Sequence, residues 1–287
     1  MKKIIFICMM IMVSILVSGC ANDSMDNIEI IVTNYPNEYI VKSLYENHAT
    51  ITSIYPDGVD ISKYKISEKQ KKEYAKKDLF VYNGLIDRER SLAIDLLAIN
   101  PDLRIIDTAY VLETEYSKEE LWLNPASLLM MSQNVRLSLN EYSSSTYLQK
   151  DIDEAYEKLK ITLSELDADY RLTVESTNNK VIVVADPALK FLEKFGLQVI
   201  CIDKEAPQIT VSDAENLIKD KKISYIFLFN EEEENENVKR LLSTYTNLKT
   251  IKLHKLDNRT DAERSEKKDY VELSKSNLDL IKKELYQ

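Results

Sequence analysis

Residues 145–176 read STYLQKDIDEAYEKLKITLSELDADYRLTVES and contain neither Gly nor Pro. Apolar side chains recur in this stretch at spacings of three and four: Leu148, Ile152, Ala155, Leu159, Leu163, Leu166 and Tyr170. That spacing puts them on one face of an α-helix roughly 45 Å long, at about 1.5 Å per residue. A coiled coil is the alternative, but strict heptads are not visible over four or five turns. The stretch therefore predicts a single long helix.

Strand and helix patterns alternate on both sides of this helix. A β-branched apolar run predicts a buried strand at 28–33, and alternation of side chains predicts a second strand at 50–55. Further short runs predict strands at 79–82, 104–107, 181–184, 198–202, 225–229 and 250–253. Helical spacing predicts helices at 38–47, 67–76, 87–100, 188–195, 211–219, 238–245 and 270–285. Such alternation is typical of parallel βαβ units. We therefore expect an α/β protein with two lobes, each a parallel sheet with flanking helices, at 28–144 and 177–287, joined by one rigid helix at 145–176.

The first twenty residues have the pattern of a secretory signal. Lys2 and Lys3 precede an apolar run at 4–17, and Val-Ser-Gly-Cys follows at 17–20. The run is too short for a span of roughly 20 residues, and the closing tetrapeptide resembles a bacterial lipobox. We expect a signal peptide at 1–19, a diacylated Cys20, and a lipidated tether at 20–27 that holds the chain to the extracytoplasmic side of the cell membrane. An ordinary signal peptide with a chance cysteine is the alternative.

The charge balance excludes one class of partner. The chain has 38 Lys and Arg against 48 Asp and Glu, a formal net charge of -10. An acidic surface repels nucleic acid and anionic lipid, so no nucleic-acid partner is expected. The same balance suits a protein that handles cations.

The residue inventory also argues against an enzyme. Cys201 is the only thiol left once the signal is removed and Cys20 is acylated, and its apolar neighbours predict a buried core residue. A disulfide framework within the chain is therefore excluded. The four glycines form no phosphate-binding loop, and the two histidines are not placed for a Ser/His/Asp triad. No enzymatic activity is expected.

Five segments in order resemble the lipoprotein solute-binding subunits of zinc- and manganese-type ABC transporters. They are YPDGVDISKY at 55–64, AKKDLFVYNGL at 75–85, ELWLNP at 120–125, VVADPALKF at 183–191 and DYVEL at 269–273. The resemblance covers nearly the whole chain after the tether. It implies a ligand held between two lobes, small closing motions, a membrane permease with its ATPase as partners, and a monomer.

The chain departs from that family at the ligand site. Family sites use three histidines and one carboxylate, and the histidine places fall here on Ser62, Glu120 and Asp186. The carboxylate place falls near Phe229 or Glu231. His48 and His254, the only histidines, lie outside all four places.

Three interpretations of this departure remain open. The first is a divalent-metal site rebuilt from the carboxylates of Glu120, Asp186 and Glu231, with Ser62 as a further candidate ligand, which suits manganese, calcium or magnesium better than zinc. The second is a site without metal, in which Lys63 or Lys190 neutralises the carboxylates. The third is a set of solvated residues that bind nothing.

The resemblance and the site together favour an extracytoplasmic solute-binding lipoprotein of a metal-type ABC transporter, which binds a metal cation or a related small solute. The alternative is a surface adhesion lipoprotein on the same scaffold that has lost metal binding. The acidic run at 231–236 is interpreted mainly as a solvated loop.

Overall fold

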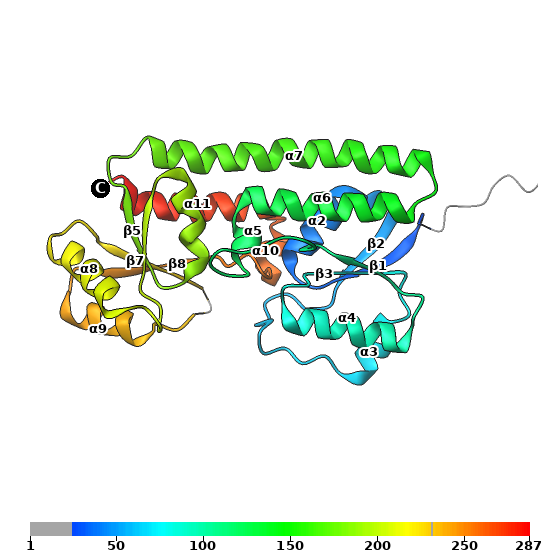
Figure 1. Cartoon of the computed structure of the whole chain (residues 1–287), viewed down its shortest axis with the longest axis horizontal. Coiled ribbons are helices and arrows are strands. Elements are labelled where there is room, and N and C mark those ends of the chain that lie inside the picture. Colours follow the sequence, from blue (N-terminus) through cyan, green and yellow to red (C-terminus); the bar gives the residue numbers. More distant parts are fainter. Residues whose placement is uncertain (1–24, 231) are drawn as a thin grey trace, which may run out of the picture.

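The computed structural model describes residues 25–230 and 232–287. The predicted signal peptide at 1–19, the predicted lipid attachment site Cys20 and most of the predicted tether at 20–27 lie outside the described residues. Within the described residues, two four-stranded sheets have all their strands parallel. The predicted fold class, two α/β lobes with a long helix across them, is confirmed (Figure 1).

The N-terminal lobe has the strand order β2-β1-β3-β4. Its strands are β1 (Ile28–Val32), β2 (Ala49–Ser53), β3 (Leu79–Tyr82) and β4 (Arg104–Asp107). Its helices are α2 (Tyr35–Tyr45), the short η1 (Glu46–His48), α3 (Glu68–Tyr74) and α4 (Asp87–Ile99). The order reverses between β1 and β3, and open α/β sheets bind their ligands outside the carboxyl ends of the strands at such a reversal.

The C-terminal lobe repeats this topology, with the order β6-β5-β7-β8. Its strands are β5 (Val181–Val184), β6 (Gln198–Cys201), β7 (Tyr225–Phe229) and β8 (Lys249–Leu253). Its helices are η2 (Pro187–Phe195), α8 (Gln208–Lys219), α9 (Glu236–Thr244), α10 (Asp261–Ser265) and α11 (Tyr270–Leu285). The helix predicted at 188–195 is a 3-10 helix, which the apolar spacing alone does not distinguish from an α-helix.

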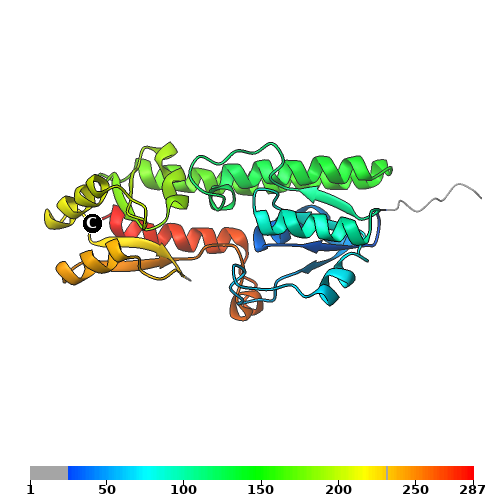
Figure 2. The ribbon, with the colours of Figure 1, turned by 60° about the horizontal axis from the view of Figure 1, so that its bottom comes forward.

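The long helix α7 spans Thr146–Glu175 and lies along both lobes in both views (Figures 1 and 2). The Ser145 hydroxyl caps its start by accepting from the Leu148 N–H at 3.3 Å. α7 does not join the lobes alone, because α6 (Pro125–Tyr142), α2 and α11 pack against it. The helix α6 was not predicted, although Asn124 caps it, Pro125 opens it, and its buried residues have helical spacing.

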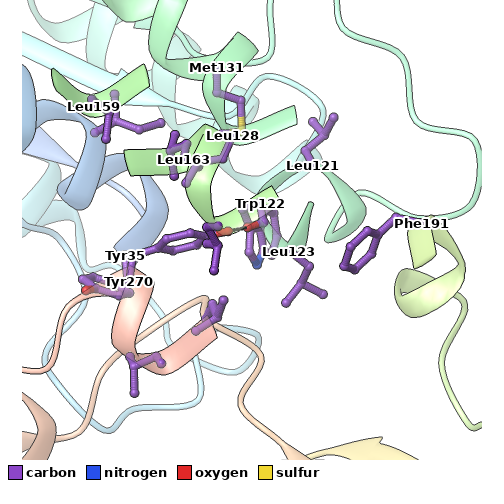
Figure 3. Packing of buried hydrophobic residues seen from close by; sticks show 14 of the residues in the cluster. Tyr35, Leu121, Trp122, Leu123, Leu128, Met131, Leu159, Leu163, Phe191 and Tyr270 are labelled. Atoms are coloured by element: carbon purple, nitrogen blue, oxygen red, sulfur yellow. Dashed lines mark hydrogen bonds between the residues drawn. The ribbon is translucent and has the colours of Figure 1, made fainter. Parts of the chain in front are cut away.

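One buried apolar cluster runs through both lobes. It contains Ile30 from the first sheet, Phe227 from the second and Leu163 from α7. Figure 3 shows its centre, where the Tyr270 hydroxyl donates to the carbonyl of Trp122. Moving the lobes far apart would expose this cluster to water at a cost of about 25 cal/mol per Å² of apolar surface. We therefore infer that the lobes keep nearly one arrangement.

The buried face of α7 can be tested by truncation. Leu163 is 1% exposed and Ile161 is 59% exposed, so the two residues sample opposite faces of the same turn. We expect Leu163→Ala to lower the free energy of unfolding by about 2–5 kcal/mol, because it leaves a cavity in the shared cluster. Ile161→Ala should change it by less than about 0.5 kcal/mol. Equal effects in urea unfolding would contradict this assignment of the faces.

In the part of the chain that the structure describes, no helix is long and apolar enough to cross a bilayer. Cys201 is 7% exposed, and burial raises the pKa of its thiol to about 12. The prediction of a buried, unreactive core cysteine is confirmed.

Candidate functional site

Two carboxylates meet at the carboxyl edge of the C-terminal sheet. Asp186 follows β5, and its Oδ1 accepts from the Ala188 N–H at 2.7 Å, which caps η2. Glu232 follows β7, and its Oε2 accepts from the Phe229 N–H at 3.2 Å. Burial, with the nearby Asp186 charge, raises the pKa of Glu232 to about 7. Glu232 therefore keeps its proton up to about pH 7, and a cation could take the place of that proton.

These two side chains line a pocket of about 380 Å³ at the ends of β5, β6 and β7. Asp203, Glu205 and Glu233 also line this pocket. It lies where the strand order reverses, the place at which open parallel sheets bind ligands. Its lining carries a clear excess of negative charge, which favours a cation over an anion.

A lysine faces the same carboxylates. Lys255 follows β8, its side chain is 24% exposed, and its Nζ lies 3.7 Å from Glu119 Oε1. Burial lowers the pKa of Lys255, but nearby carboxylates outweigh this and raise it above its ordinary value. In order of effect, those carboxylates are Glu119, Asp257, Glu232 and Asp186. Lys255 is therefore positively charged at neutral pH, and Glu119 is the carboxylate nearest to its ammonium group among the printed pairs of the described residues.

Glu120, which the family resemblance places in the site, lies beside Glu119 at the start of α5 (Glu120–Leu123). Its Oε2 accepts from the Tyr116 N–H at 3.0 Å. The Tyr116 hydroxyl donates to Glu193 at 2.9 Å, and the Lys190 ammonium lies 5.1 Å from the centre of the Tyr116 ring. The described contacts therefore give Lys190 an aromatic partner. They tie Glu120 to the loop before α5.

Ser62 and Lys63 are both held by Asp60. The Ser62 hydroxyl donates to Asp60 Oδ1 at 2.5 Å, and Lys63 Nζ lies 2.8 Å from Asp60 Oδ2. The Lys63 side chain is 85% exposed. Asp186 is thus brought together with Glu232 in one pocket, whereas the described contacts of Ser62 and Lys63 are within their own loop. Glu231 lies outside the described residues, so its assignment stays a prediction.

The two histidines lie in other surroundings. The two ring nitrogens of His48 each lie 3.3 Å from a carboxylate, one from Asp26 and one from Asp151. His254 Nδ1 accepts from the Leu256 N–H at 2.9 Å, and its Nε2 lies 3.4 Å from Glu263. Over residues 25–230 and 232–287, no group of three or more His, Cys, Asp and Glu is arranged to hold a metal ion. The donor set that is present consists of oxygens, which suits zinc poorly.

Sequence reasoning missed Glu119, Glu232, Lys255 and Asp257 as members of this site. Glu232 is the second residue of an acidic run that was interpreted mainly as solvated, and the resemblance pointed to its neighbour. Lys255 and Asp257 follow the last strand of the sheet, and the carboxyl ends of parallel strands meet at one edge. This position after the last strand was the sequence signal that could have indicated Lys255 and Asp257 as site residues. Trp122, which belongs to the segment at 120–125 that resembles the family, is 2% exposed and donates from Nε1 to the Lys255 carbonyl at 3.0 Å.

A family model described as the zinc-uptake complex component A, periplasmic, matches residues 30–284. The chain belongs to this family. The zinc-binding lipoprotein AdcA of Streptococcus pneumoniae is 22% identical over 313 residues, which cover 98% of this chain and 61% of that protein. The chain thus spans about three fifths of the length of this curated relative.

Solved structures share the fold. The metal-dependent lipoprotein YcdH of Bacillus subtilis has a TM-score of 0.74 at 18% identity, covering 91% of this chain and 100% of that one. The laminin-binding protein Lmb of Streptococcus agalactiae has a TM-score of 0.73 at 16% identity, covering 90% and 100%. Lmb is described as a bifunctional protein with adhesin and metal-transporting activity. At these identities the likeness shows the architecture alone.

Proposed function

We propose that this chain is the solute-binding lipoprotein of a metal-type ABC transporter, and that it binds a divalent cation at the Asp186–Glu232 pair. The family membership supports the transport role. The main observation behind the cation site is the pair itself: the pKa of Glu232 is raised to about 7 by burial and by the nearby carboxylate of Asp186. A cation that displaces the proton of Glu232 is the ligand such a pair favours.

The charge count supports the same class of ligand. The pocket is lined by the carboxylates of Asp186, Asp203, Glu205, Glu232 and Glu233 and by one ammonium group, that of Lys204, so the lining has an excess of negative charge. Oxygen donors suit manganese, calcium or magnesium, and they bind zinc less selectively than imidazole does. We therefore expect zinc to bind with no advantage over manganese, unlike at a three-histidine site.

The remaining parts of the proposal concern location and partners. Cys20 would carry the lipid and hold the protein on the extracytoplasmic side of the cell membrane. A membrane permease, with its ATPase on the other side, would receive the solute from a monomeric binding protein. The proposal assigns the chain no catalytic step.

Calorimetric titration of manganese and calcium tests the cation site. We expect Asp186→Asn and Glu232→Gln each to weaken binding by at least about tenfold, because each removes a negatively charged ligand. The exposed Asp213 of α8 offers a matched control, and Asp213→Asn should leave binding unchanged. Since the cation competes with a proton on Glu232, affinity should fall as the pH drops below about 7. If neither Asp186→Asn nor Glu232→Gln weakens binding, the proposed site is refuted.

A second candidate is an interaction lipoprotein that binds no cation. It is favoured by one observation, namely that Lys255 already supplies positive charge to the carboxylates. Absence of a heat signal with every cation, in the wild type and in a variant without the lysine charge, would support this candidate.

A further inference from the structure

The chain enters the N-terminal lobe at a fixed point, just before β1. Met25 is fully buried in the shared apolar cluster, and its carbonyl accepts from the Tyr45 hydroxyl. Asp26 lies 3.3 Å from one ring nitrogen of His48, and the other ring nitrogen lies 3.3 Å from Asp151 near the start of α7. Side chains from α2, η1 and α7 therefore hold this segment against the body of the lobe.

The entry point lies at one end of the molecule. The start of α7 and the amino ends of β1 and β2 lie together at this end, and the C-terminal lobe lies at the opposite end (Figure 1). We call the surface formed by residues 25–27, 46–48 and 144–151 the entry end. The carboxyl edge of the N-terminal sheet faces the other way, because parallel strands that begin here all end on the far side.

The entry end carries charges of both signs. A cavity of about 470 Å³ lies there, and its charged lining residues are Lys42, Lys158, Glu46, Asp151 and Glu154. Such a surface suits zwitterionic lipid head groups, whereas the chain as a whole, at a net charge of -10, repels anionic lipid. Tyr147 is 66% exposed, and its ring centre lies 6.4 Å from that of His48. A tyrosine of this kind suits the boundary between water and lipid, because its ring is apolar and its hydroxyl is polar.

The distance from the entry end to a lipid on Cys20 is limited by the length of the chain. Only four residues separate Cys20 from Met25, so the connection spans at most about 18 Å even when fully extended. The 30 residues of α7 span about 45 Å, at 1.5 Å per residue. We propose that this short connection holds the entry end against the bilayer, with zwitterionic phospholipid as the surface that it contacts. This inference rests on the lipid attachment proposed above and adds an orientation to it.

Energy transfer to labelled lipid tests the orientation. The full lipidated chain is reconstituted in phosphatidylcholine vesicles, with a fluorophore attached after Ser144→Cys at the entry end or Ser243→Cys on α9 of the C-terminal lobe. Both serines are exposed. Cys201 does not compete for the label, because it is buried and the pKa of its thiol is raised to about 12. We expect transfer to acceptor-labelled lipid to be at least about twofold larger from position 144 than from position 243, because the short connection keeps position 144 nearer to the bilayer.

A longer connection is the matched control. A 20-residue Gly/Ser linker inserted between Ala21 and Asn22 leaves the folded part and Cys20 unchanged, and it allows an extension of about 70 Å more. The difference between the two positions should then shrink. Adding phosphatidylglycerol to the vesicles should not increase transfer from position 144, because anionic lipid repels the acidic chain.

The outcomes separate this inference from the lipid attachment. If the wild type does not associate with vesicles, or if Cys20→Ser associates equally well, the lipid attachment falls and the orientation falls with it. If association depends on Cys20 but transfer from position 243 equals or exceeds that from position 144, the orientation is refuted and the lipid attachment stands. A difference that persists undiminished with the long linker would refute the short connection as its cause. Transfer from position 144 that rises with phosphatidylglycerol would refute the preference for zwitterionic lipid.

Discussion

Replacing Glu38 by alanine should lower the free energy of unfolding by about 3–5 kcal/mol, the range for breaking a buried ion pair from one side. Glu38 lies in the first turn of α2 and is 3% exposed. Its carboxylate lies 2.8 Å from Arg264 Nη1, 3.2 Å from Arg259 Nη2 and 2.9 Å from Lys42 Nζ. Without it, the Arg259 guanidinium, whose side chain is 10% exposed, would keep its charge and lose its carboxylate.

Two further variants make this expectation specific. Glu38→Gln keeps the volume and removes the charge, so it should also destabilise, whereas a pure packing role would leave it nearly neutral. Glu68→Ala is the matched control, since Glu68 is an acidic residue in the first turn of α3 whose side chain is 76% exposed. It should hardly move the midpoint of urea unfolding. A midpoint for Glu38→Ala equal to that of Glu68→Ala would show that the network adds no stability.

The pKa of Glu38 gives the same expectation a pH dependence. Burial opposes ionisation of this carboxyl group, but Arg264 and Lys42 outweigh it and lower the pKa from 4.5 to about 2. A lowered folded-state pKa means that the stabilisation is complete above about pH 4.5 and is lost as the pH falls toward 2. The stability difference between wild type and Glu38→Gln should therefore shrink over that range.

This network joins the two lobes at the segment that follows β8. The Asn258 amide donates to the carbonyls of Pro56 and Val59 at 2.9 and 3.1 Å, and the Gly58 N–H donates to the Arg259 carbonyl at 2.7 Å. Arg264 Nη2 also pairs with Asp57 at 2.6 Å. Together with the shared apolar cluster, these contacts oppose a wide opening of the lobes.

The long helix could be predicted because its signal is local. Its apolar spacing runs without Gly or Pro, and its buried residues, from Leu148 to Val174, are those that the period selects. The sheets could be predicted equally well, since most strands are short apolar runs and β2, with the sequence ATITS, alternates along its length. The helix α6 carried the same signals and was overlooked. The 3-10 form of η2 has no such local signal, because its apolar residues have spacings that an α-helix also uses.

The site was harder to predict from the sequence, because its residues come from segments that are far apart along the chain. Asp186 was found by resemblance, and its partner Glu232 lies one residue beyond the position that the resemblance indicated. Lys255 was not predicted, because its place depends on a hydrogen bond from Trp122 in the other half of the chain. A sequence pattern reports neighbours along the chain, whereas the position of Lys255 depends on contacts with residues that are far away in the sequence.

The second large effect is expected at Glu89, a fully buried carboxyl group in α4. Its oxygens accept from the Thr33 hydroxyl at 2.6 Å, the Asn83 N–H at 2.8 Å and the Asn34 amide at 3.3 Å. These donors come from the chain just after β1 and β3, where the N-terminal strand order reverses. Glu89→Leu would leave them buried without an acceptor, at about 1–3 kcal/mol for each group. We expect a loss of several kcal/mol, or a chain that does not fold.

The conservative variant Glu89→Gln isolates the ionisation of this group. Burial raises the pKa of Glu89 from 4.5 to about 7, although its hydrogen bonds to Thr33 and Asn83 act in the opposite direction. Between these two pH values the unfolded chain releases the proton and the folded chain keeps it. The contribution of Glu89 to the free energy of unfolding is therefore complete below about pH 4.5 and declines by roughly 3 kcal/mol as the pH rises through 7.

Urea unfolding of the wild type and Glu89→Gln at pH 4.5, 6 and 8 tests whether the stabilisation by Glu89 declines as the pH rises. The comparison isolates this contribution because glutamine cannot ionise. The stability of Glu89→Gln relative to the wild type should rise across the series and level off above about pH 7. Asp213→Asn on the exposed face of α8 is the control, and it should not reproduce this rise. A flat difference for Glu89→Gln as well would mean that Glu89 ionises equally in both states. In that case its burial is compensated by the surrounding donors, and the N-terminal sheet edge is held by a charged carboxylate.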